Sequence, residues 1–176
     1  TIWWAFCLWG WWWHKSLTSP GKRIMSFKPF TTGVLGLELS AEERHFIAGE
    51  RPWGYILFAR NIETPAQLTD LCAALREAGG RPDAPVLIDQ EGGRVQRLRP
   101  PHWTNYPPGG ALGALFEADR DAGLRASWLM GRLHAFDLQP LGINVNCLPV
   151  LDVRTQQGHD AIGDRALGYT EDQVSV

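Results

Sequence analysis

Charged residues crowd the end of one apolar run, in the stretch PVLIDQEGGRVQRLR at residues 85–99. Asp89 and Glu91 are two positions apart, so in an extended backbone they point to the same side, roughly 6–7 Å apart at their Cα atoms. Carboxylates at about 5–5.5 Å suit a retaining glycosidase, and wider pairs suit an inverting one. Two carboxylates also suit a hard metal such as magnesium. A structural alternative is that Glu91 pairs with a nearby arginine and shapes the turn.

Asp89 and Arg97 predict a second kind of chemistry. Asp89 ends an otherwise apolar strand, where an ionised carboxylate is costly unless donors or a ligand match it. Arg97 lies eight residues later, and Gly92 and Gly93 allow the loop between them to fold back sharply. A carboxylate beside a planar guanidinium presents acceptors and donors in fixed directions, which suits vicinal sugar hydroxyls. We therefore expect a site for a neutral polyol that needs no metal or other cofactor.

The rest of the chain supplies elements that would position these residues. Ser40 and Glu43 have the spacing of a helix capping box. Thr64 and Pro65 begin a second helix that a glycine pair ends. These signals alternate with apolar runs and predict strands at 31–39, 53–60, 84–90 and 143–153, helices after Ser40 and Thr64 and at 117–139, and a loop at 99–113.

Apolar strands separated by amphipathic helices indicate an α/β fold with parallel strands. An open doubly wound sheet and a (β/α)8 barrel both fit, and in both the chemistry lies beyond the carboxyl ends of the strands. Polar residues follow three of these strand ends: Arg60 and Asn61, Asp89 and Glu91, and Asp152. Asp152 suits the pocket and a structural role equally well. Neither G-x-G-x-x-G after the first strand nor G-x-x-x-x-G-K-[ST] occurs, which disfavours a nucleotide site.

Composition narrows the partners further. The 176 residues are enough for one domain with a real core. The net charge of -2, from 17 basic and 19 acidic side chains, gives no reason to expect nucleic acid or an anionic membrane as partner. Three cysteines are an odd number and favour free thiols in a reducing compartment, hence a cytoplasmic location. The histidines are scattered and no C-x-x-C occurs, so no metal site is expected.

The beginning of the chain is unusual, with six of its nine tryptophans in the first thirteen residues. It is shorter than the about 20 apolar residues that span a bilayer. It also lacks the charged start and small-residue cleavage site of a secretory signal. We expect residues 1–24 to be a leader outside the fold, with residues 25–176 forming the domain. An interfacial membrane anchor is the alternative.

The segments GYILFARNI, VLIDQEGGRVQRLR, LPVLDV and IGDRALG together resemble the bacterial β-N-acetylhexosaminidases of glycoside hydrolase family 3. They occur in the family's order and spacing over residues 31–170. The resemblance implies a single-domain (β/α)8 TIM-type barrel and a retaining mechanism. It also implies that Asp89, Arg97 and Arg165 hold hydroxyls of a terminal N-acetylglucosamine, with Glu91 and Asp152 as possible pocket residues.

The same resemblance implies catalytic groups that this chain lacks. The family's nucleophile is an aspartate on a late strand, and its acid/base is a histidine near a K-H-[FI]-P-G-H-G motif that does not occur here. Four strand–helix units use the residues up to about 170, so eight would need roughly 300. We therefore expect an incomplete barrel of about four units, with the catalytic residues beyond Val176.

The implied function is hydrolysis of terminal non-reducing N-acetylglucosamine from cell-wall muropeptides bearing anhydro-N-acetylmuramic acid, in peptidoglycan recycling. The chain by itself is expected to be inactive and marginally stable, because a half barrel leaves strand edges unpaired. Two alternatives stay open. One is a remnant that binds N-acetylglucosamine without cleaving it, and the other is a β-glucosidase-like member of the same family.

Overall fold

The computed structural model describes residues 27–155 and 159–175. The expected leader at residues 1–24 lies outside this described part. The described elements follow in the order β1 (Lys28–Thr32), α1 (Ala41–Glu50), β2 (Pro52–Leu57), η1 (Ala59–Asn61), α2 (Pro65–Gly79), β3 (Val86–Ile88), α3 (Gly109–Ala118), α4 (Arg120–Leu138), η2 (Gln139–Leu141), β4 (Val145–Asn146), η3 (Gly163–Arg165) and α5 (Glu171–Val174).

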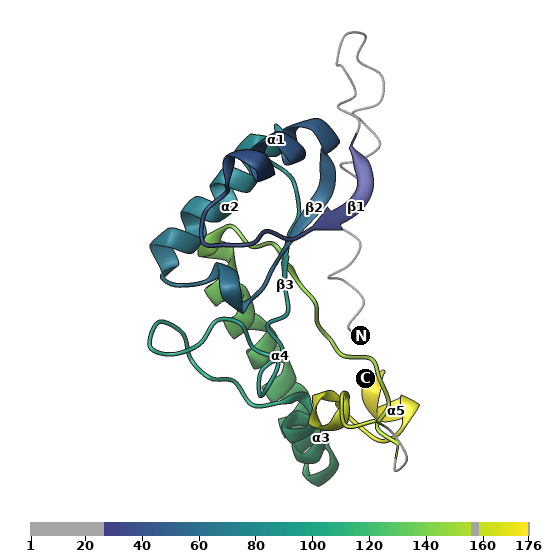
Figure 1. The fold of residues 1–176 in the computed structure, drawn as a ribbon. Helices are drawn as coiled ribbons and strands as arrows, with labels where there is room; N and C mark the ends of the chain where they lie inside the picture. The colour runs from purple at the N-terminus through teal and green to yellow at the C-terminus, as the bar shows by residue number, and fades with distance from the viewer. Residues whose placement is uncertain (1–26, 156–158, 176) are drawn as a thin grey trace, which may run out of the picture.

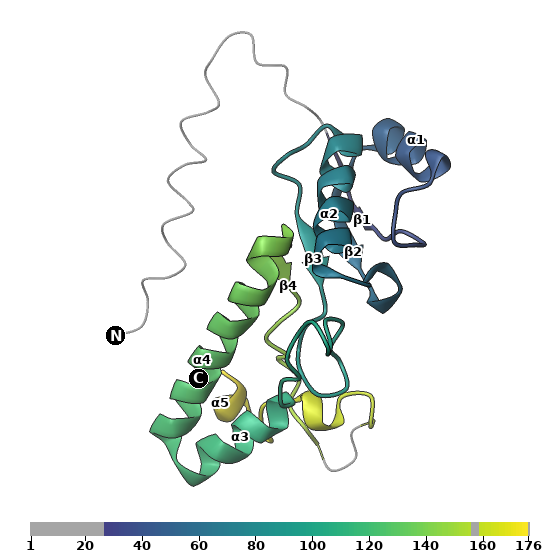
Figure 2. The same cartoon turned by 90° about the vertical axis from the view of Figure 1, so that its left-hand side faces the viewer.

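The four strands form one parallel sheet in the order β1-β2-β3-β4 (Figure 1 labels β1 to β3, and Figure 2 shows β4 beside β3). Each strand therefore lies beside the next one in the sequence. A doubly wound sheet would reverse this order at a switch point, whereas a barrel adds its strands one after another. The topology thus favours the barrel among the two predicted architectures.

The predicted starts of the first two helices are confirmed, whereas the third, expected from residue 117, begins at Arg120. Ser40 caps α1, accepting a hydrogen bond from the Glu43 amide at 3.1 Å, and the Glu43 carboxylate accepts one from the Ser40 amide at 2.9 Å. Thr64 caps α2, Pro65 is its first residue, and Gly80 ends it with a φ of 63°. These local bonds satisfy backbone groups that a helix terminus otherwise leaves unpaired.

The hydrophobic core lies between the sheet and one layer of helices. Helices α1 and α2 lie on the same side of the sheet (Figure 2). Leu68, Leu71 and Leu75 of α2 are buried against it. The end of α4 and the turn after it join the same core, which also contains Tyr55, Leu57, Val86, Ile88, Leu138, Leu141 and Ile143.

Several expected boundaries were wrong. The first strand lies at Lys28–Thr32 instead of 31–39, and the other strands are shorter than predicted. Residues 109–118, assigned in part to a loop, form helix α3. Its glycines serve close packing: a Cβ at Gly113 would lie 1.7 Å from the Leu167 carbonyl oxygen. The glycines of this stretch therefore allow α3 to pack closely against residues 164–167, and they do not indicate a loop.

Two tryptophans of the described part, Trp53 and Trp128, are exposed. Trp53 is 38% exposed and Trp128 is 52% exposed. The guanidinium carbons of Arg125 and Arg132 lie 4.5 and 4.9 Å from the Trp128 ring, which gives that ring cation–π partners at the surface. Within the described residues, no helix has the length and apolar content needed to cross a membrane.

Candidate sugar-binding site

Asp89 and Arg97 meet at the carboxyl end of β3. Arg97 Nη2 donates to Asp89 Oδ2 at 2.9 Å, and about a quarter of each side chain is exposed. The buried Nε of Arg97 has no hydrogen-bond partner among the described residues. Buried donors usually have partners, so this unpaired group is an exception. The expected contact between Asp89 and Arg97 is therefore present, and its role in binding a sugar stays a prediction.

Gln90 also follows the third strand, and its role was not predicted: it brings Arg97 back to Asp89. Its fully buried amide oxygen accepts from the backbone amides of Arg97 and Leu98, both at 2.9 Å. The Asn146 side chain accepts a hydrogen bond from the Gln90 backbone amide at 3.0 Å and donates one to the Gln90 carbonyl oxygen at 2.8 Å. Buried amides that make several bonds fix a loop in one conformation.

The glycine pair turns the loop as predicted. Gly92 and Gly93 have φ values of 106° and 56°, a region that side chains rarely adopt. A Cβ at Gly92 would also lie 2.2 Å from the Pro107 carbonyl oxygen. Residues 91 and 92 then bond back to Val95, closing a tight turn before Arg97.

Glu91 pairs with Arg165, which lies 74 positions later. Arg165 Nε and Nη2 donate to the two carboxylate oxygens at 2.8 and 2.7 Å. The Glu91 side chain is only 7% exposed. Our structural alternative for Glu91, a partner among the arginines of its own loop, was wrong, because the folding of the later segment brings Arg165 closer.

The segment that carries Arg165 is joined to the loop a second time. Arg94 donates to Asp164 at 3.2 Å and to the carbonyl groups of residues 160–162. The hydrogen bonds to Glu91 raise the pKa of Arg165, and the negative charges of Glu91, Asp152 and Asp89 add to the effect. Asp152 is exposed, and its side chain forms no hydrogen bond or ion pair within the described residues, so it acts on this group through its charge.

Several other polar and aromatic side chains have structural roles. Asn61 is fully buried and donates to the carbonyl groups of Val34 and Gly36, while Arg60 also donates to Val34. Trp103 packs against the core, and Tyr106 donates to Asp137 at 2.6 Å. Burial and the bond to Asp137 raise the pKa of Tyr106. None of these side chains forms a hydrogen bond with either of the two arginine–carboxylate pairs.

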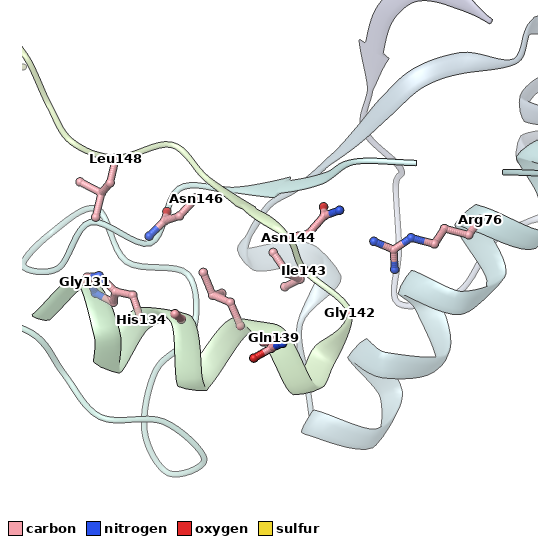
Figure 3. Close-up of a pocket in the computed structure, with 11 residues that line it drawn as sticks. Arg76, Gly131, His134, Gln139, Gly142, Ile143, Asn144, Asn146 and Leu148 are labelled. Carbon is pink, nitrogen blue, oxygen red and sulfur yellow. The ribbon is translucent and has the colours of Figure 1, made fainter. Parts of the chain in front are cut away.

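A cavity of about 550 Å³ lies elsewhere, between α2, α4 and β4 (Figure 3). Arg76, His134, Asn144, Asn146 and Leu148 are among its lining residues, and no predicted sugar-binding residue is. Within the described ranges, no three His, Cys, Asp or Glu side chains are grouped so as to hold a metal ion.

The arrangement is suited to binding. Asp89 accepts a hydrogen bond from Arg97, and Glu91 accepts hydrogen bonds from Arg165. The two pairs therefore present fixed acceptors and donors at the carboxyl end of β3. A retaining glycosidase instead places two carboxylates across the scissile bond, one as nucleophile and one as acid. Two carboxylates that are each held by an arginine fit a sugar clamp better than that catalytic pair.

Comparison with known proteins identifies the family. Residues 24–176 match the model of the glycosyl hydrolase family 3 N-terminal domain. The chain belongs to glycosyl hydrolase family 3. The β-hexosaminidase of Stenotrophomonas maltophilia strain K279a is 40% identical over 148 residues, which are 82% of this chain and 41% of that protein. The β-hexosaminidase of Methylococcus capsulatus is 39% identical over 143 residues, 81% of this chain and 41% of that protein.

Solved structures of family 3 proteins share the fold. NagZ from Neisseria gonorrhoeae, in complex with N-trifluoroacetyl-D-glucosamine, superposes with a TM-score of 0.78 at 30% identity, over 85% of this chain and 44% of that one. A family 3 β-N-acetylglucosaminidase from Paenibacillus gives 0.69 at 35% identity, over 83% and 27%. The fold is therefore part of a TIM-type barrel, as predicted. The chain spans about two fifths of the length of the curated relatives it matches.

Proposed function

We propose that this chain forms the N-acetylglucosamine-binding part of a family 3 β-N-acetylhexosaminidase. In this proposal Asp89, Arg97 and Arg165 bind hydroxyls of the terminal non-reducing sugar. Glu91 fixes Arg165, and Asp152 contributes negative charge at the rim. No residue of this chain serves as nucleophile or acid/base, and the complete enzyme retains configuration at the anomeric carbon.

One observation carries the proposal. Two arginine–carboxylate pairs, with contacts of 2.7–2.9 Å, stand beside each other at the carboxyl end of β3. Substrate sites of barrels lie at this end of the strands. The names of the relatives supply the substrate class, since they are β-hexosaminidases and one neighbour holds an N-acylated glucosamine.

The biological substrate and location are part of the same proposal. We infer that the complete enzyme removes N-acetylglucosamine from muropeptides during peptidoglycan recycling in the cytoplasm. The free thiols of Cys72 and Cys147 suit a reducing compartment. The clamp needs no metal or organic cofactor, since arginines and carboxylates supply all its donors and acceptors.

Sugar titration tests the proposal. Ligand-observed NMR with the 176-residue chain should show binding of N-acetylglucosamine, and Asp89→Asn should weaken it by at least about tenfold, since a charged hydrogen-bonding group contributes about 1.5–3 kcal/mol. Asp83→Asn is the matched control, because Asp83 is exposed and pairs with Arg81. Equal binding by both variants would contradict the assignment. Glucose binding as tightly as N-acetylglucosamine would favour the β-glucosidase-like alternative.

Hydrolysis provides a separate test of the catalytic roles. The purified chain should not cleave a chromogenic N-acetylglucosaminide. Robust turnover that Glu91→Gln abolishes would instead make Asp89 and Glu91 a catalytic pair.

A further inference from the structure

Cys147 occupies a position beside Asp89 that the proposed sugar clamp does not use. Ile88 and Asn146 are partners in the parallel register of β3 and β4, so Asp89 and Cys147 come next on the two strands. The Cys147 amide donates to the Ile88 carbonyl oxygen at 2.9 Å, which keeps the strands together at this point. Neighbours in register point to the same face of a sheet.

Alternation along β4 indicates which face this is. Asn146 and Leu148, on either side of Cys147, line the cavity between α2 and α4, as do Ile143 and Asn144 before them, whereas Cys147 does not (Figure 3). Because successive side chains alternate, Cys147 points to the opposite face of the sheet. That is the face of Asp89, whose carboxylate is near enough for its charge to act on the thiol.

The thiol is exposed and uncharged at neutral pH. Cys147 is an exposed free cysteine, in contrast to the buried Cys72. Partial desolvation and the neighbouring carboxylates of Asp89 and Glu91 raise the pKa of Cys147 to about 11. A neutral thiol leaves the charge of Asp89 to its ion pair with Arg97.

We propose that Cys147 is a specificity-determining residue of the sugar site, where its small side chain contacts the bound sugar, and that covalent modification of its thiol closes the site. This inference rests on the proposed function of the clamp. The residue that follows β4 then lines the sugar site, together with the loop after β3 and the segment around Arg165.

Alkylation with iodoacetamide at mildly alkaline pH tests the inference. The thiolate sulfur displaces iodide and forms a C–S bond, and the thiol proton passes to the buffer. Peptide mapping by mass spectrometry reads Cys147 and Cys72 separately. Cys72 is an internal control, because burial also raises its pKa to about 11 while keeping it from reagent.

N-acetylglucosamine at ten times its dissociation constant should slow alkylation of Cys147 by about 11-fold, if binding shields the thiol fully. The rate at Cys72 should not change. The chain alkylated at Cys147 should lose sugar binding. Iodoacetamide treatment should not change the sugar affinity of Cys147→Ser, which has no thiol at this position, while Cys147→Phe should not bind.

Two failures are distinguishable. If NMR shows the sugar bound while Cys147 reacts at an unchanged rate, or if the alkylated chain binds normally, the inference about Cys147 is wrong and the clamp stands. If the unmodified chain does not bind the sugar at all, the proposed function itself fails for this chain, and the role of Cys147 fails with it.

Discussion

The Glu91–Arg165 ion pair should stabilise the fold much more than its neighbour, the Arg94–Asp164 pair. Both pairs join the loop after β3 to the segment at residues 163–165. They differ in burial, since the side chain of Glu91 is 7% exposed whereas those of Arg94 and Asp164 are 47% and 49% exposed. The second pair is therefore a matched control for the first.

The expected magnitudes follow from contact and burial. Two unit charges about 4 Å apart interact by about 4 kcal/mol at an effective dielectric constant near 20. Arg165 keeps a quarter of its side chain in solvent, so we expect a smaller coupling free energy of about 2–3 kcal/mol for the buried pair. Exposed pairs usually give about 0.2–1 kcal/mol, which is our expectation for Arg94 and Asp164.

Double-mutant cycles measure both couplings. Glu91→Gln and Arg165→Met form one cycle, and Asp164→Asn and Arg94→Met form the other, with free energies of unfolding from urea titrations. The cycle removes the contribution of the other bonds that Arg94 makes to carbonyl groups. Equal coupling energies in the two cycles would refute the reasoning from burial.

Other predictions concern the turn and the core. Gly92→Ala should lower the free energy of unfolding by several kcal/mol or prevent folding, because its Cβ would lie 2.2 Å from the Pro107 carbonyl oxygen. Gly131→Ala, in open space on α4, should raise the free energy of unfolding by about 0.5–1 kcal/mol. Thermal melts that rank the two variants the other way would contradict this. Burial lowers the pKa of His134, with a smaller opposing effect from Asp137. The unfolded chain then binds the proton more readily, so stability present above about pH 6.5 is lost as the pH falls below that value. His134→Leu should flatten this loss in urea midpoints measured from about pH 7 to 5, and an unchanged slope would assign it to other groups.

Local signals in the sequence predicted much of the fold. The caps at Ser40 and Thr64 depend on contacts three residues apart, so both helices began where expected. The apolar runs placed β2 and β3, and therefore Asp89 at a strand end. The return of Arg97 to Asp89 followed from the glycine pair between them.

Features that depend on distant segments could not be found this way. Arg165 was singled out only through family resemblance, because nothing near it in the sequence indicates its bond to Glu91. Helix α3 depends on close packing of its glycines against residues 164–168. The position of Cys147 beside Asp89 depends on the register of β3 and β4, which the apolar patterns did not fix.

A structure of the chain with N-acetylglucosamine bound would show directly whether the two arginine–carboxylate pairs form the sugar site. We expect sugar hydroxyls within hydrogen-bond distance of Asp89 and Arg97, with Arg165 at the same ligand. A sugar bound instead in the cavity between α2 and α4, with both arginine–carboxylate pairs untouched, would contradict it.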